Sequence, residues 1–444
     1  MTKRHLLLPI ALAVMSAGAC GPSQPPPEET PIEVSPTGGQ ATSPSATAQR
    51  GCELQVSAYP SNSHDGNHWV EGRGHFPEAE VLSVDLGSEA QWIVGLGTEA
   101  GSLWLASDEI GDHHLIRLES GQPEALAFDE VWPEAAPFGI RRTESGLDII
   151  GERLQPASPL TYPALLPSGG VVTISRNGRL TYSADGISRE LDIAGLPDSR
   201  VLLDDKGRVL LYINPTGVYD HGVLGDRIEA DGLAVVDPET GELLWSAEAK
   251  GELVFEGVAP LWVDFNRDGV REVLATASDR AVGARYILFN EGGGEAARSE
   301  AIGHGYRWRH AIAVGPFGPE GEWELVGVRT PHLRAVVEYF RWEGDQLVEV
   351  AELAGYSSHS LGSRNLDQSA AGDFDGDGGV ELLVPTEDRS ALAAITRGAS
   401  GAAEEWRLEL ESNLASNLAF ACHGGEELAL AAGLQNGLIQ FWIP

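Results

Sequence analysis

Acidic side chains recur at alternate positions in two segments of this sequence. Residues 373–381 read DFDGDGGVE and residues 264–272 read DFNRDGVRE, and the two segments align without a gap. Side chains at positions 1, 3 and 5 of such a loop converge when the chain curls, position 6 needs glycine for a sharp turn, and position 7 offers a backbone carbonyl. Position 9 is a glutamate in both segments. The spacing predicts oxygen-rich sites of the kind that Ca²⁺ prefers.

Two other interpretations of these loops stay open. One is a solvated turn without a bound ion, since aspartate and glycine favour turns for conformational reasons. The other is a catalytic pair of carboxylates, which is less favoured because acids that bind a cation cannot also donate a proton. An EF-hand is excluded, because it requires a glutamate at position 12, where this sequence has Val384 and Ala275.

The acidic loops belong to an internal repeat. Residues 313–328 keep the glycine, phenylalanine and leucine pattern but have Pro316, Gly318 and Glu320 at the ligand positions, and a shortened copy has Cys422 at its first position. The first positions are therefore 264, 316, 373 and 422, separated by 52, 57 and 49 residues. A period of this length, built from short apolar runs and glycine-rich turns, is typical of β-propeller blades.

Each period contains four strand-like runs, so the predicted fold is all-β, a β-propeller of four-stranded antiparallel blades over residues 51–444. Seven blades fit the spacing, and eight is the alternative because residues 79–160 divide ambiguously. The final copy has only three runs before the chain ends. The N-terminal strand at residues 52–59 is expected to supply the missing outer strand and close the ring, which would remove an exposed edge.

The repeated loops resemble the FG-GAP or VCBS repeats of integrin-type β-propellers, and the whole chain resembles uncharacterised bacterial VCBS-repeat proteins. This resemblance implies structural Ca²⁺ bound by loops between the first and second strands of a blade. The ligands that it implies, transferred by position and with backbone carbonyls at position 7, are Asp264, Asn266, Asp268, Val270 and Glu272 in one loop and Asp373, Asp375, Asp377, Gly379 and Glu381 in the other.

Turns between second and third strands, and links between blades, are expected on the face opposite the acidic loops, because strand direction alternates within a blade. Four unusual polar segments fall there, at residues 219–227, 303–311, 330–333 and 355–368. They could form a hydrogen-bonding pocket, or they could bond neighbouring blades together. The candidate ligand-binding residues, expected around the mouth of the central channel, are His221, His304, Arg307, Arg309, His310, His332, His359, Arg364, Asn365 and Asp367.

The charge and the motifs of the sequence disfavour several classes of function. A formal net charge of -36, from 66 acidic and 30 basic residues, repels nucleic acids and anionic lipid surfaces. The sequence has no motif for a serine or cysteine triad. It therefore favours a monomeric binding or interaction module, for a protein or a small-molecule ligand, over an enzyme. The alternative is an envelope enzyme, a hydrolase or lyase with its site at the channel mouth.

The N-terminus has the features of an export signal. Basic residues precede an apolar run, and Ala17-Gly18-Ala19-Cys20 resembles the lipobox of bacterial lipoproteins. A lipoprotein-type signal peptide is predicted at 1–19, with lipidation of Cys20 and a disordered Pro/Ser/Thr tether at 20–50. Gly21 after the cysteine indicates an outer-membrane lipoprotein of the bacterial cell envelope, in contact with the membrane only through its lipid anchor. An ordinary secretory signal is the alternative.

The two remaining cysteines stand near the two ends of the predicted propeller. Export places Cys52 and Cys422 in an oxidising compartment, where an isolated pair is typically bridged. The sequence therefore predicts a disulfide between them, with two separate buried thiols as the alternative.

Overall fold

The computed structural model describes residues 56–58, 64–119, 121–128, 139–143, 146–150, 158, 160–425 and 427–444. All of them belong to one compact unit, Arg50–Pro444. The predicted signal peptide (1–19), the tether (20–50), Cys20 and Cys52 lie outside the described residues. Among the described residues, none forms a helix with the length and apolar character needed to cross a bilayer.

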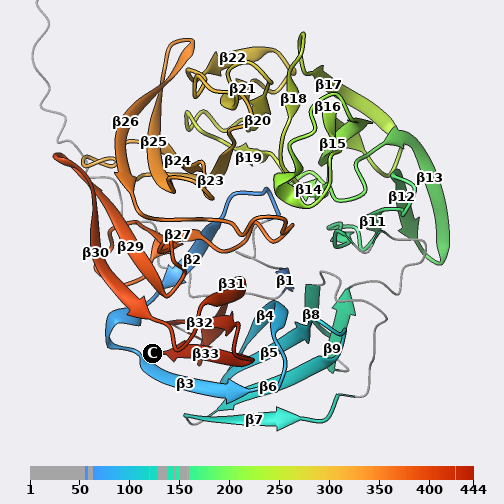
Figure 1. The fold of residues 1–444 in the computed structure, drawn as a ribbon. Helices are drawn as coiled ribbons and strands as arrows, with labels where there is room; N and C mark the ends of the chain where they lie inside the picture. Colours follow the sequence, from blue (N-terminus) through green and yellow to red (C-terminus); the bar gives the residue numbers. More distant parts are fainter. Residues whose placement is uncertain are drawn as a thin grey trace, which may run out of the picture. The chain divides into compact units, whose positions relative to one another are not determined.

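Strands are the main regular structure of the described residues, and most of them fall into successive groups of four antiparallel strands (Figure 1). Consecutive strands pair with each other because short turns connect them. Six groups of four consecutive strands are β4–β7 (Ala90–Thr98, Gly101–Asp108, His113–Glu119, Gln122–Leu126), β10–β13 (Ala164–Leu165, Val171–Ile174, Arg179–Ala184, Ile187–Ala194), β14–β17 (Leu202–Leu203, Val209–Thr216, Glu229–Asp237, Glu242–Glu248), β19–β22 (Leu261–Val263, Glu272–Ser278, Arg285–Phe289, Glu295–Arg298), β23–β26 (Arg309–Gly315, Glu324–Arg329, Val336–Glu343, Gln346–Ala354) and β27–β30 (Ala370–Asp373, Glu381–Pro385, Ala391–Gly398, Gly401–Glu409).

The last strands of the chain form a further group that an N-terminal strand completes. These strands are β31 (Leu414–His423), β32 (Glu427–Leu434) and β33 (Leu438–Ile443), and β3 (Glu80–Asp85) pairs antiparallel with β33 from Glu80 opposite Ile443 to Asp85 opposite Leu438. Closure of the ring by an N-terminal strand is thus confirmed. The pairing also covers the outer edge of β33, which would otherwise be open to strand addition.

The strand expected to close the ring, residues 52–59, is not the one that does so. Its described part, β1 (Val56–Ala58), pairs instead with β8 (Gly139–Thr143), which also pairs with β9 (Gly146–Ile150). The physical reason is connectivity. The closing strand β3 leads through four residues into β4, which pairs with β31 at Thr98 opposite His423, so β3 starts beside the last strands of the chain, whereas β1 lies beside β8. The predicted number of blades, seven with eight as the alternative, stays a prediction.

Hydrophobic side chains fill the layers between neighbouring sheets. One core cluster joins Leu274 and Leu288 of the β19–β22 sheet to Leu325 and Phe340 of the β23–β26 sheet. Inner strands are covered on both faces, and every residue of β20 is buried. Outer strands are covered less, as the alternating exposure along β30 shows. This gradient from inner to outer strands, together with the small sequential sheets, defines a β-propeller, and the predicted fold class is confirmed.

Residues 64–76, the central segment, run along the inner strands of the ring and were assigned no role by the sequence. The backbone oxygens of His64 and Asp65 accept hydrogen bonds from Leu203 and Trp262, at 2.8 Å each. Within this segment β2 (Trp69–Arg73) pairs parallel with β27 and lies beside it in Figure 1. Short connecting pieces are β18 (Val254–Phe255) and the 3₁₀ turns η1 (Phe76–Glu78) and η2 (Gly222–Leu224). The central segment thereby links the innermost strands of several sheets.

Candidate functional site

The acidic loop 373–381 connects β27 to β28. Carboxylate oxygens of Asp373, Asp375 and Asp377 lie within 4.8 Å of one another. Backbone amides hold all three, because Gly376 donates to Asp373 at 2.8 Å, Asp377 donates to Asp375 at 3.0 Å and Gly379 donates to Asp377 at 2.6 Å. The glycine at position 6 has a φ of 90°, in the left-handed region that favours glycine, as the spacing predicted. The loop therefore presents converging oxygen atoms.

The four carboxyl groups of this loop lie close together. Burial, with the neighbouring Asp375, Asp373 and Asp377 adding to its effect, raises the pKa of Glu381 to about 8. One oxygen of Glu381 accepts a hydrogen bond from the Phe374 amide at 2.7 Å. The donor set fits Ca²⁺, which takes six to eight oxygen ligands and would balance these charges. The Gly379 carbonyl stays a predicted ligand.

The acidic loop 264–272, between β19 and β20, has a similar backbone but different side-chain contacts. Position 6 again has a φ of 90°, and position 4 is left-handed in both loops, at Arg267 here and at a glycine in the other. Both oxygens of Asp264 accept backbone hydrogen bonds at 3.0 Å, from Asp268 and Gly269. The Asn266 side-chain amide donates to Asp268 at 3.0 Å.

An amide donor thus takes the place of one acidic ligand in this loop. Burial raises the pKa of Glu272, and Asp268 and Asp264 add to the effect. Glu272 accepts a hydrogen bond from the Phe265 amide at 2.9 Å, as its counterpart does in the other loop. The Val270 carbonyl stays a predicted ligand. This loop carries the same framework with a weaker donor set.

The shortened copy of the loop has a cysteine at its first position. Cys422 is buried at the end of β31 and is disulfide-bonded. Cys52, its predicted partner, lies outside the described residues. A cysteine here holds the chain covalently at the position where the two acidic loops have their first aspartate, a predicted metal ligand.

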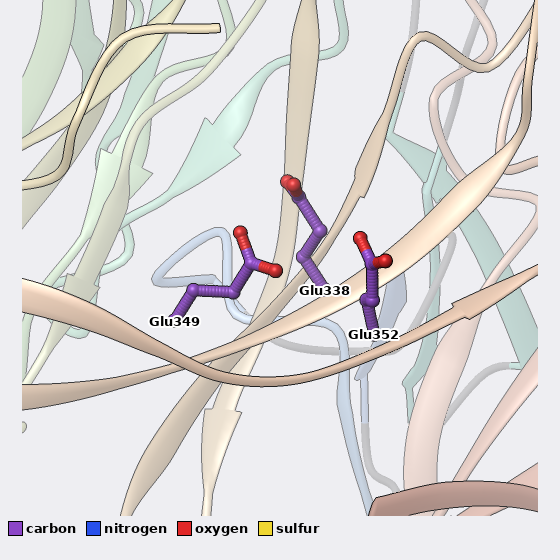
Figure 2. A group of neighbouring side chains, drawn as sticks. All are labelled: Glu338, Glu349 and Glu352. Atoms are coloured by element: carbon purple, nitrogen blue, oxygen red, sulfur yellow. The ribbon is translucent and has the colours of Figure 1, made fainter.

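A third group of acids, Glu338, Glu349 and Glu352, also comes together, on β25 and β26 (Figure 2). Here the counter-charges are arginines. Glu338 is fully buried and lies 2.9 Å from Arg309 and 2.6 Å from Arg329. Two guanidinium groups already balance the buried carboxylate, so this group is an ion-pair network that joins strands and does not fit a metal ion.

The opposite face of the propeller contains a cavity of about 510 Å³. Strand alternation explains its position, because its residues come from the β15–β16 turn, the link before β23, the β24–β25 turn and the link before β27. Each of the four polar segments identified in the sequence contributes. The lining residues are Asp220, His221, Gly222, Val223, Gly225, Asp226, Arg227, Tyr306, Arg307, Trp308, Thr330, Pro331, His332, Leu333 and Leu361.

Aromatic and apolar side chains form much of the cavity wall and rim. Tyr219 and Tyr306 stack with ring centroids 5.3 Å apart, and the Tyr306 hydroxyl donates to Asp220 at 3.1 Å. Leu333 and Leu361 at the rim are 59% and 72% exposed. Large apolar side chains gathered around a hollow are typical of binding surfaces.

A buried carboxylate orients the side chain of His221 directly. Its Nδ1 lies 2.6 Å from Oε1 of Glu256, which is fully buried. The other Glu256 oxygen has no hydrogen-bond partner in the described part of the chain. An ionised carboxylate accepts hydrogen bonds only, so with Glu256 ionised Nδ1 of His221 is the donor and Nε2 is the nitrogen left for a ligand.

Of the ten predicted ligand-binding residues, His221, Arg307 and His332 line the cavity. His304 is exposed outside it. Two arginines are held by acids: Arg309 by Glu338, and Arg364 by Asp198 and Asp226 at 3.0 and 2.6 Å. The expectation of an open channel mouth is corrected for the other four, which are buried beneath the cavity. They are His310, His359, Asn365 and Asp367.

His68 of the central segment explains why these residues are buried. His310 and Asp367 hold equivalent positions in neighbouring repeats, and both contact His68: its Nε2 lies 3.5 Å from Asp367, and its ring centroid lies 5.9 Å from that of His310. Arg200 pairs with both carboxylate oxygens of Asp367. Sequence reasoning missed His68 and Arg200, because neither lies in a recognisable motif.

Burial keeps the histidines beneath the cavity neutral. It lowers the pKa of His68 to about 4, against the opposing effect of Asp367, and it lowers the pKa of His310 well below the ordinary value. His359 has a pKa lowered to about 3, chiefly by burial, and it hydrogen-bonds to His332 at 2.9 Å. The polar side chains buried under the cavity thus form a hydrogen-bonded network that joins neighbouring sheets.

Among the comparisons with known proteins, the one with solved structures gave matches. No protein-family model and no curated protein matches the chain. Solved β-propeller structures that it resembles include BBS1N in complex with ARL6DN (8% identity, 84% of this chain and 98% of that chain, TM-score 0.46), BamB from Moraxella catarrhalis (12%, 82%, 98%, 0.37) and the WD40 β-propeller domain of Doa1 (9%, 82%, 95%, 0.39). At these identities the likeness concerns the fold alone.

Proposed function

We propose that this protein is an exported, lipid-anchored, calcium-binding β-propeller of the bacterial outer membrane that binds a partner protein or a small molecule through its cavity face. The observation that carries the proposal is the 510 Å³ cavity with exposed apolar side chains at its rim. Exposed leucines beside a concave, partly aromatic surface favour contact with another molecule, because covering them removes apolar area from water.

The calcium part of the proposal is supported by the two acidic loops, which match the FG-GAP or VCBS pattern. Both connect the first and second strands of a sheet. A cation there would neutralise crowded carboxylates and stiffen the turn, which is a structural role. The loops belong to the face away from the cavity, so the ion is not proposed to contact the ligand.

The envelope location is supported by the lipobox-like Ala17-Gly18-Ala19-Cys20 and by the polar tether that follows it. A lipidated Cys20 would attach the propeller to the membrane, and a tether of thirty residues without a core would let it reach a partner at some distance. Labelling with a radioactive or clickable fatty acid tests the anchor. Incorporation into the wild type that is lost in Cys20→Ser is expected.

Site-specific photo-crosslinking tests the binding face. A photoreactive amino acid replaces Leu361 at the cavity rim or, as a matched control, Ile187 on β13, since both side chains are 72% exposed. We expect a discrete crosslinked species in the producing cells from position 361 and not from 187. Equal crosslinking from both positions, or none from 361, would contradict a binding role for the cavity face.

An envelope enzyme is the second candidate, and the His221–Glu256 pair favours it. A histidine whose Nδ1 is held by a buried carboxylate can act as a general base through Nε2. His221→Gln separates the candidates: an enzyme loses turnover that the wild type shows, whereas a binding module shows no turnover in either protein and its crosslink at position 361 is at most weakened.

A further inference from the structure

We infer that the cavity is a binding site for an organic carboxylate with an aromatic or branched apolar body, either a free acid or the C-terminal carboxylate of a peptide. The inference deepens the proposed function, on which it rests, by naming the ligand chemistry. It comes from the pairing of charges around the cavity, from the orientation of His221 and from the shape of the apolar wall.

The acids that line the cavity are already balanced. Asp220 accepts a hydrogen bond from Tyr306 and lies 3.5 Å from Arg280. Asp226 lies 2.6 Å from Arg364. A cationic ligand would therefore compete with guanidinium groups that are in place, which makes a basic ligand the weaker match.

Two cavity arginines, by contrast, form no close ion pair. No ion pair within 4.0 Å joins Arg227 or Arg307 to a carboxylate of the described residues, and the same is true of Arg334 on the neighbouring turn, although Tyr306, with Arg280 and Arg227, lowers the pKa of Asp220. Arg307 donates only to the backbone oxygen of Tyr306, at 2.8 Å. In a chain with 66 acidic and 30 basic residues, acids are abundant enough to pair each arginine. Unpaired arginines at one cavity therefore favour an anionic ligand, since guanidinium groups bind carboxylates in bidentate fashion.

His221 supplies a third polar contact. Glu256 holds Nδ1, so the ring is fixed and Nε2 remains for the ligand. In its protonated form the ring donates to Glu256 on one side and to a ligand carboxylate on the other. Such fixed donors lower the entropy lost on binding.

The body of the ligand follows from the remaining wall. Tyr306, Pro331, Leu333 and Leu361 are apolar or aromatic and lie at the same cavity. A volume of about 510 Å³ falls in the range of roughly 300–1,000 Å³ typical of small-molecule sites. An aromatic or branched side chain bearing a carboxylate fits both parts of the site.

Matched acid and amide probes test the inference by calorimetry on the full propeller. The free-acid pair is 4-hydroxyphenylacetate and 4-hydroxyphenylacetamide, and the peptide pair is one pentapeptide ending in phenylalanine as the acid and as the amide. We expect at least one acid to bind about tenfold more tightly than its amide. Arg227→Gln with Arg307→Gln should weaken that acid about tenfold, while Arg179→Gln, an exposed arginine on β12, should change nothing.

Preference for one acid over the other identifies the source of the carboxylate and supports the inference in either case. Equal binding of acids and amides, unchanged affinity in the double variant, or no binding of any acid overturns it. If the crosslink at position 361 persists in that situation, the binding role of the cavity face stands and only the ligand chemistry is wrong. If both fail, the proposed function itself is wrong.

Discussion

The acidic loops and the cavity lie on opposite faces of the propeller, and they differ in how far apart in the sequence their polar side chains are. Loop 373–381 gathers its carboxylates within nine residues. The cavity combines residues from 220 to 361, contributed by four connections between strands. Local spacing specifies the loops, whereas the cavity exists only because successive sheets bring distant turns to the same face.

A second difference separates the cavity from the interior beneath it. His221 and Arg307 line the cavity. His310 and Asp367, which belong to the same set of predicted ligand-binding residues, are buried, and both contact His68. Arg200 pairs with Asp367. Residue type alone does not distinguish a side chain that binds a ligand from one that joins two sheets. Four experiments can break or sharpen these contrasts.

Disrupting the buried ion pair between Arg200 and Asp367 should lower the free energy of unfolding more than any other proposed change. Asp367→Asn removes the carboxylate that pairs with buried Arg200, and removing one partner of a buried pair costs about 3–5 kcal/mol. Urea unfolding should show this loss in the free energy of unfolding. Arg364→Gln, at a pair that is partly exposed, serves as the comparison and should cost much less. A stable Asp367→Asn protein with weakened ligand binding would instead place Asp367 in the binding site.

Removing calcium should cause the next largest loss in the free energy of unfolding, and most of this loss should come from loop 373–381. With free Ca²⁺ at 100 times its Kd, binding stabilises the folded state by about 2.7 kcal/mol, so chelation should lower the free energy of unfolding by that amount. Asp373→Asn with Asp375→Asn should abolish most of this response and remove one site in calorimetry. The same response in the variant and the wild type would show that this loop is a polar turn without an ion.

Lowering the pH should reduce the free energy of unfolding through the buried histidines beneath the cavity. Folding lowers the pKa of His359 from the ordinary 6.5 to about 3, so the unfolded state binds the proton more readily. This contribution to stability is complete above pH 6.5 and is lost as the pH falls toward 3, at about 1.4 kcal/mol per pH unit. His359→Gln should flatten the profile of unfolding free energy against pH, and exposed His304→Gln should not.

The pH profile of the variant must be compared with that of the wild type, because other buried groups change stability with pH in the opposite direction. Burial, with Glu256 nearby, raises the pKa of Glu229 well above its ordinary value, which favours the folded state as the pH falls. A His359→Gln profile parallel to that of the wild type would contradict a buried neutral imidazole.

Asn266→Asp should have the smallest effect and should make the two acidic loops more alike. It replaces the amide that donates to Asp268 with a carboxylate, restoring the donor set of the 373 loop. We expect calcium affinity at the 264 loop to rise a few fold, measured by calorimetry in the Asp373→Asn, Asp375→Asn background. Lower affinity would mean that the contacts of Asp264 with the backbone, and not position 3, limit this loop.

The sequence predicted best the features that depend on a few neighbouring residues or on a regular repeat. The repeat spacing predicted a β-propeller, and the four runs of its third copy correspond to β27–β30. The glycines at position 6 of the acidic loops were identified because only that residue adopts a left-handed turn without strain. The alternation of strands also placed the four polar segments on one face.

What the sequence could not determine depended on contacts between distant residues. Closure by β3 in place of residues 52–59, and the course of the central segment, depend on backbone pairing across the whole ring. The burial of His310 and Asp367 depends on His68, which lies more than two hundred residues away in the sequence. By itself, the sequence determined the repeated unit and its acidic turns, because these are set within a few residues. Only the tertiary structure decided which polar side chains face a cavity, since that depends on what packs over them.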